Sequence, residues 1–285
     1  HALLLEAVDA ARKADVVIFV GGLNKNENQD CEGADRRSLN LPYGQDELIG
    51  ELARVNRNLV AVIISGNAVA MPWVNEVPAI VEAWYGGTEA GNAIASVLAG
   101  EVNPSGKLPF TFPVRLEDNP AIALDAYPGD GKQVEYKEGI FVGYRWNDRE
   151  RIKPLFCFGH GLSYTTFEYG KVTAEGRQMG PDGTITVSVP VKNTGSRAGA
   201  EIVQLYVSDL KSSLPRPVKE LKGFRKITLQ PGQEQTVSFT IDRKALSFYD
   251  DTKQDWVAEP GAFEALVGAS ACDIRGKAAF ELTAR

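Results

Sequence analysis

Apolar residues in the first 115 positions follow two alternating spacings. Helical spacing, with an apolar residue every three or four positions, runs through residues 2–15 and 44–56. Uninterrupted apolar runs at 16–22 and 59–66 are typical of strands buried on both faces of a parallel sheet. Further strands are expected at 79–87 and 107–113, with a helix at 88–100 between them. Strands separated by helices predict a parallel α/β sandwich of the flavodoxin-like type.

Single residues indicate the ends of the helix at 88–100 and the edge position of the strand at 107–113. Thr88 is a suitable N-cap for the helix, and Gly100 is a suitable stop at its other end. Pro109 lacks a backbone N–H, so the strand at 107–113 is expected at an edge of the sheet rather than in its centre.

The apolar period changes to two in the second half of the chain. Apolar and polar residues alternate in four segments, at 184–191, 201–208, 235–241 and 262–268, and turn-forming residues separate them. Short alternating strands of this kind predict an antiparallel β-sandwich. The Cys…Trp…Cys signature of immunoglobulin domains is absent, so the fibronectin type III-like variant is favoured.

These patterns divide the chain into an α/β-sandwich domain at 1–115, a connecting segment at 116–160 and a fibronectin type III-like domain at 161–285. The connecting segment contains aromatic residues and is not rich in Gly and Ser, unlike a flexible linker. It is therefore expected to be ordered and to pack on both domains.

Composition narrows the function classes. The net charge of the 285-residue chain is −6 with both signs interspersed, which disfavours nucleic acid as a partner. No apolar run approaches the length of a membrane span. The three cysteines are far apart and odd in number, so no disulfide or zinc motif is predicted. With only two histidines, a His-based metal site and a Ser-His-Asp triad are disfavoured, and His160 is expected to be a structural loop residue.

Charged residues gather in the segment QDCEGADRR, residues 29–37, directly after the first strand. The carboxyl ends of strands in an open α/β sheet are where ligands bind. On spacing alone, however, the segment fits a solvated loop better. A second Gly-rich segment, GGTEAG at 86–91, could cradle a phosphate at a helix N-terminus, but a tight packing turn explains it more simply.

Several motifs occur in one order along the chain: ADVVIFVGGLN, DCEGADRRSLNLPYGQDELI, VAVIISGNAVAMPWV, AIVEAWYGGTEAGNAIASVLAGEVNPSGKLPFTFP, YKEGIFVGYRW and PLFCFGHGLSYTTFEY. Together they resemble glycoside hydrolase family 3, from about residue 13 to about residue 170. The fibronectin type III-like pattern fits the remainder. The resemblance implies a retaining, exo-acting β-glucosidase or β-xylosidase that needs no cofactor or metal and acts on plant oligosaccharides.

The resemblance also assigns candidate residues. Family members of this type begin with a (β/α)8 barrel that supplies the nucleophilic aspartate, so this chain is expected to be a later portion that partners a barrel and is inactive alone. The glutamate before the glycine of an EGxDR loop is the general acid/base, which is Glu32 here, with Glu27 as the rival. Asp30 is a less favoured alternative. Asp35 and Arg36 match the remainder of the motif and are expected to orient the loop.

Other expectations stay open at this stage. Trp84 is the best aromatic candidate for contact with a sugar, because it is expected at the carboxyl end of a strand. A periplasmic or secreted location follows from the resemblance only. The competing interpretation is a non-catalytic carbohydrate-binding or scaffold module, and a nucleotide-binding α/β domain is a weaker one.

Overall fold

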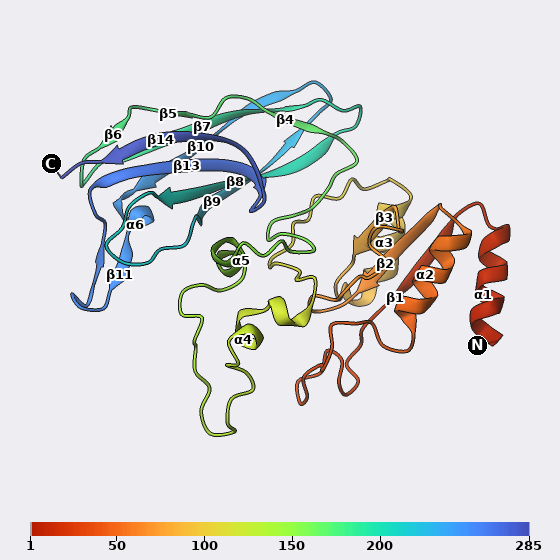
Figure 1. The fold of residues 1–285 in the computed structure, drawn as a ribbon. Coiled ribbons are helices and arrows are strands. Elements are labelled where there is room, and N and C mark those ends of the chain that lie inside the picture. Colours follow the sequence, from red (N-terminus) through yellow and green to blue (C-terminus); the bar gives the residue numbers. More distant parts are fainter. Residues whose placement is uncertain (1, 285) are drawn as a thin grey trace. The chain divides into compact units, whose positions relative to one another are not determined.

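The computed structural model describes residues 2–284, which divide into two compact units. The first unit contains the chain up to residue 99 and a short return at 112–119, and the second contains 100–111 and the chain from 120 onward. The first unit contains one described sheet, and the second contains the others (Figure 1). Each unit also buries its own set of apolar side chains.

The first unit is built around a parallel three-stranded sheet of order β1-β2-β3. Its elements are α1 (Ala2–Lys13), β1 (Val17–Gly22), α2 (Gln45–Val55), β2 (Leu59–Ile64), β3 (Ala79–Glu82), η1 (Gly87–Glu89), α3 (Ala90–Leu98) and η2 (Leu116–Asp118). Helix α2 contacts both β1 and β2 and buries Ile49 and Leu52. The parallel sheet, with helix α2 between β1 and β2, confirms the predicted α/β class.

Strand β1 is less buried than its sequence predicts. Only Phe19 of this strand is buried, whereas Ile18 and Val20 are both more than half exposed. The difference arises because β1 lies at an edge of the described sheet, while β2 has a neighbour on each side. In β2 the expectation is correct, since four of its six residues are buried.

Two predicted ends are wrong and one is confirmed. Strand β3 ends at Glu82 rather than at residue 87, because Trp84 adopts a left-handed backbone conformation (φ 53°) that a strand cannot include. Thr88 lies inside the short η1 turn and is not the N-cap of α3, whose N-cap position is Glu89. Gly100 does follow the helix with φ 75°, as expected of a C-terminal stop.

The strand predicted at 107–113 does not form. Within this segment Phe112 makes an isolated bridge, and the remaining residues are irregular. The backbone of Leu108 exchanges hydrogen bonds with His160 and Gly159 (both 2.8 Å), but Pro109 and Pro113 remove the donors that would extend this pairing. The segment therefore ends as an extended connection between the two units.

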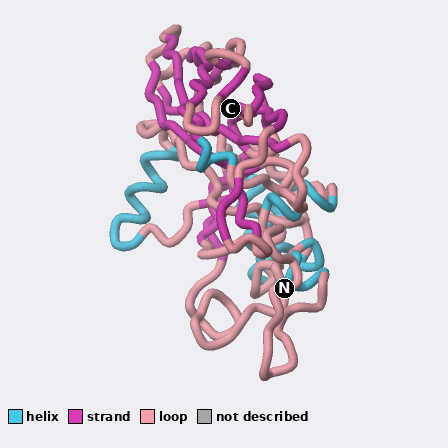
Figure 2. The backbone as a smooth tube through the Cα atoms, turned by 90° about the vertical axis from the view of Figure 1, so that its left-hand side faces the viewer, coloured by secondary structure: helices cyan, strands magenta, loops and turns pink. Residues whose placement is uncertain are grey.

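The second unit is a β-sandwich with two principal sheets. A four-stranded sheet has the path β10-β7-β4 with β5 beside β7, and a five-stranded sheet has the order β6-β14-β13-β8-β9. Figure 2 shows these strands, in magenta, filling the part of the chain that ends at the C-terminus. The elements are α4 (Pro120–Ala123), α5 (Tyr144–Glu150), β4 (Phe167–Tyr169), β5 (Thr173–Ala174), β6 (Gln178–Met179), β7 (Thr184–Asn193), β8 (Gly199–Asp209), β9 (Glu220–Leu229), β10 (Glu234–Asp242), α6 (Arg243–Leu246), β11 (Phe248–Asp250), β12 (Asp255–Val257), β13 (Gly261–Ser270) and β14 (Asp273–Leu282).

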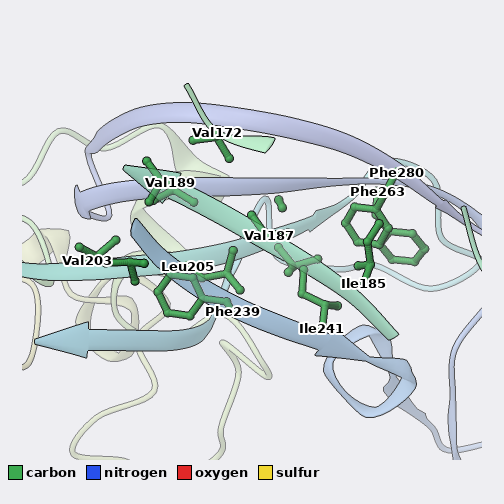
Figure 3. Close-up of a cluster of buried hydrophobic side chains, with 14 of the residues drawn as sticks. Val172, Ile185, Val187, Val189, Val203, Leu205, Phe239, Ile241, Phe263 and Phe280 are labelled. Carbon is green, nitrogen blue, oxygen red and sulfur yellow. The ribbon is translucent and has the colours of Figure 1, made fainter. Parts of the chain in front are cut away.

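The alternating apolar residues of this unit meet in one core, shown in Figure 3. In β7 the side chains of Ile185, Val187 and Val189 are buried while the residues between them are not, which is the period-two pattern read from the sequence. Phe263 of β13 and Phe280 of β14 are cross-strand partners in one sheet, and their rings stack in this core with centroids 5.7 Å apart. The predicted antiparallel β-sandwich is confirmed.

A disulfide is present that the cysteine spacing does not indicate. Cys157 and Cys272 are bonded, although 115 residues separate them in the sequence, and Cys31 is free. Spacing along the chain carries no information about this pair, because the fold alone brings the segment before β4 to the turn between β13 and β14. His160, three residues after Cys157, stacks on Phe156 with ring centroids 5.3 Å apart, as befits a loop residue with a structural role.

Candidate active-site loop

The charged segment lies in a long loop, residues 23–44, that leaves the carboxyl end of β1 and leads to α2 (Figure 1). At its start the Leu23 N–H donates to the Ile64 carbonyl (2.7 Å), which ties the loop to the end of β2. Residues 24–30 form a compact turn, in which the Asp30 N–H donates a hydrogen bond to the Asn24 carbonyl (2.9 Å). Glu27 is exposed within this turn.

Asp30 fixes the loop to the ends of two strands. Its Oδ2 accepts a hydrogen bond from the Gly66 N–H (2.6 Å), just past β2, and another from the Tyr85 hydroxyl (2.8 Å), just past β3. Hydrogen bonds to a carboxylate are shorter and stronger than those between neutral groups. The carboxylate therefore ties the loop to the carboxyl edge of the sheet, two residues before Glu32.

Arg36 provides a second attachment on the other side of Glu32. Its Nη2 donates to the Ala68 carbonyl (2.6 Å), and its Nε lies 3.9 Å from Asp30 Oδ1. Both side chains of this ion pair are mostly shielded from solvent, with 11% and 14% exposure, so the attraction is less screened than on an open surface. The pair closes the base of a five-residue projection, residues 31–35.

Glu32 lies within this projection. Its side chain is exposed, and the neighbouring Gly33 has open space around it. Within the projection the Cys31 thiol donates to the Ala34 carbonyl at 3.3 Å. Asp35 is also in the projection and is exposed. The loop thus presents the predicted acid/base residue outward from a base held by Asp30 and Arg36.

A second carboxyl group lies near the base of the loop, at the end of β3. Glu82 Oε1 accepts hydrogen bonds from the Ser65 hydroxyl and the Trp84 N–H, each at 3.2 Å, and within the described residues its Oε2 has no partner. Burial raises the pKa of Glu82 to about 7, and the nearby charge of Asp30 adds to that shift. This carboxyl is the strongly perturbed acidic group of the first unit.

The two aromatic residues after β3 have different surroundings. The Trp84 ring packs edge-on against Phe112 with centroids 6.2 Å apart, so part of its surface is occupied within the unit. The Tyr85 ring is half exposed while its hydroxyl is engaged by Asp30. Burial and the contact with Asp30 raise the pKa of Tyr85 to about 12, so it stays a hydrogen-bond donor at neutral pH.

No group of three or more His, Cys, Asp or Glu within residues 2–284 is arranged to hold a metal ion. None of the helices in this described range is long and apolar enough to cross a membrane.

Comparison with known protein families shows which family this chain belongs to. Residues 1–144 match the glycosyl hydrolase family 3 C-terminal domain, and residues 201–271 match the fibronectin type III-like domain. The chain belongs to glycoside hydrolase family 3. The family match covers the whole loop, including Glu27, Glu32 and Arg36, and the second match runs from β8 into β13.

The relatives of this family 3 chain are β-glucosidases. It is 59% identical to β-glucosidase BoGH3A of Bacteroides ovatus over 97% of its length, and 49% identical to thermostable β-glucosidase B of Acetivibrio thermocellus over 95%. The fold superimposes on the crystal structure of a Kluyveromyces marxianus β-glucosidase in complex with glucose with a TM-score of 0.91, at 41% identity and over 98% of this chain. The chain spans only about a third of these proteins, 37%, 36% and 33% respectively.

Sequence reasoning missed three residues of this family 3 loop and its base. The sequence indicates Asp30 only as a less favoured acid, favours Trp84 over its neighbour Tyr85, and does not point to Glu82. No spacing signal links them, because Asp30 and Tyr85 are 55 residues apart and meet only when the strands are paired. The usable signal is their common position at the carboxyl ends of adjacent parallel strands.

Proposed function

We propose that this chain is the C-terminal portion of a retaining, exo-acting β-glycosidase in which Glu32 is the general acid/base. One observation carries the proposal: Glu32 projects from a loop tied on both sides to the carboxyl edge of the sheet, in a chain whose family 3 relatives are β-glucosidases. Because those relatives are named β-glucosidases, a β-glucoside is the favoured substrate, and a β-xyloside is the second choice.

The mechanism assigns one step to this chain and one to a domain outside it. Retaining glycosidases use two carboxyl groups about 5–5.5 Å apart. A nucleophilic aspartate from a (β/α)8 barrel in the same protein attacks the anomeric carbon, and Glu32 protonates the leaving oxygen. Glu32 then removes a proton from the water that hydrolyses the glycosyl–enzyme ester. Asp35 and Arg36 are assigned to orienting the loop, and Trp84 to a contact with the sugar.

The disulfide supports a periplasmic or secreted location. Disulfides persist in oxidising compartments and are rare where thiols are kept reduced, and Cys157–Cys272 is a bond between distant parts of the chain. Such a location also suits an enzyme that trims terminal sugars from plant oligosaccharides.

The decisive experiment measures kcat/KM for Glu32→Gln in the full-length protein on two substrates. A general acid matters most when the leaving group is a poor one, so a β-glucoside of an aliphatic alcohol should lose much more kcat/KM than an activated aryl β-glucoside. Glu27→Gln is the matched control and should leave both values unchanged. A variant Glu32→Gln that hydrolyses the alkyl glucoside normally would refute the assignment, and loss in Glu27→Gln would transfer the role to Glu27.

A further inference from the structure

The contacts at the base of the loop assign a role to residues other than Glu32 itself. We propose that Asp30, Gly66 and Tyr85 form an anchor that positions Glu32 for proton transfer, with Tyr85 acting as a positioning residue through Asp30. The proposal rests on the acid/base role proposed for Glu32 and adds the residues on which its placement depends.

The first support is the arrangement of the anchor. A single carboxylate oxygen of Asp30 receives donors from the ends of two different strands, the Gly66 N–H at 2.6 Å and the Tyr85 hydroxyl at 2.8 Å. Two donors that approach one oxygen from separate strands restrict both the position and the rotation of the carboxylate. Because Glu32 follows only two residues later, this restriction limits where its carboxyl can lie.

The second support is the absence of a side chain at position 66. A Cβ built on Gly66 would lie 3.0 Å from Tyr85 Cε2 and 3.2 Å from Asp30 Oδ2, closer than ordinary van der Waals contact. Any larger residue there would push the tyrosine ring or the carboxylate away. Glycine therefore permits the close approach that the anchor requires.

The third support is the chemistry of the donor. Tyr85 keeps its proton at neutral pH, since burial and Asp30 raise its pKa to about 12. The anchor therefore stays formed over the pH range in which Glu32 would exchange protons. Arg36, 3.9 Å from the other oxygen of Asp30, holds the far side of the projection and completes its base.

Hydrogen–deuterium exchange of this chain tests the anchoring itself. Tyr85→Phe removes only the hydroxyl, so amides in residues 29–37 should exchange faster while β2 and β3 keep their protection. Tyr249→Phe, the same change in an exposed tyrosine of the second unit, is the control and should leave the loop unchanged. Unaltered exchange of the loop in Tyr85→Phe would overturn the anchor.

Kinetics of the full-length protein test the positioning role. In Tyr85→Phe and Gly66→Ala, kcat/KM on an alkyl β-glucoside should fall by about tenfold, with a much smaller loss on an activated aryl β-glucoside, because only the proton transfer is misplaced. Equal losses on both substrates, or no loss while Glu32→Gln shows the leaving-group effect, would overturn the positioning role. Absence of that effect in Glu32→Gln would instead refute the proposed acid/base residue, and the exchange data would still decide whether the anchor exists.

Discussion

Cys157 and Cys272 join the segment before the β-sandwich to the turn between its last two strands, with Cα atoms 6.0 Å apart. The bond closes a loop of 115 residues that includes most of the second unit. A cross-link of this span removes much of the conformational freedom of the unfolded chain.

Removing the disulfide should therefore destabilise the second unit. In the double variant Cys157→Ala with Cys272→Ala, the free energy of unfolding should fall by about 5 kcal/mol, as loop-closure entropy predicts. Urea denaturation followed by circular dichroism measures the change. Cys31→Ser, which removes the free thiol, is the control and should have little effect. Equal stability of the double variant and the parent chain would show that the bond contributes little.

Glu82 should make the stability of the first unit depend on pH. Its pKa is raised from 4.5 to about 7 in the folded state, so folding favours the protonated carboxyl. This contribution to the free energy of unfolding is on the order of 3 kcal/mol. It is fully present below the pKa of the unfolded state and is lost as the pH rises through 7.

Glu82→Gln should remove this dependence, since the amide keeps an oxygen for Ser65 and Trp84 and cannot ionise. The difference between the unfolding free energies at about pH 5 and about pH 8 should be smaller in the variant than in the parent chain. The exposed Glu76→Gln serves as the control and should retain the slope of the parent. An unchanged slope in Glu82→Gln would mean that this carboxyl is not the titrating group.

Asn193 should be intolerant of a change as small as Asn193→Asp. The side chain is fully buried: its amide nitrogen donates to the carbonyls of Arg197 (2.8 Å) and Leu229 (3.0 Å), and its oxygen accepts from Thr165 and Gly195. Aspartate would turn a carboxylate oxygen towards two carbonyls, at a cost of about 3 kcal/mol. Thermal denaturation should show a large loss of Tm for this variant and little change for the exposed Asn75→Asp.

The chain alone should hydrolyse neither aryl β-glucosides nor aryl β-xylosides. The proposed mechanism needs a second carboxyl group about 5 Å from Glu32, and it assigns that group to a barrel domain outside this chain. Release of 4-nitrophenol from 4-nitrophenyl β-glucoside or β-xyloside by the purified chain measures the activity directly. Turnover above that of the Glu32→Gln chain would contradict the division of the active site between domains.

Periodicity alone predicts most of the fold. The alternation of Ile185, Val187 and Val189 fixes which face of β7 is buried, because a strand has no other way to cover three apolar side chains on one side. Where the prediction fails, the determining interaction is not local. The exposure of Ile18 depends on the position of β1 in the sheet. The end of β3 depends on a left-handed backbone at Trp84, a conformation that propensity does not favour for tryptophan.

Some features of the candidate site could be predicted from the sequence, and others depend on the fold. The motif places Glu32 and Arg36 within one segment, so their closeness follows from the sequence. The contacts of Asp30 with Gly66 and Tyr85 join residues 36 and 55 positions apart, and they exist only because parallel strands end at the same edge of the sheet. A carboxylate that was the least favoured acid in the sequence is thus the residue with the best-defined contacts in the loop.

The base of the loop has a practical consequence for protein engineering. Since Asp30 and Arg36 are held by groups outside the projection, residues 31–35 form a short cassette between two fixed ends. Gly33, with open space where a side chain would begin, is the position at which new chemistry could be introduced first. Libraries confined to this cassette would vary the surroundings of Glu32 while the strands that support it keep their native sequence.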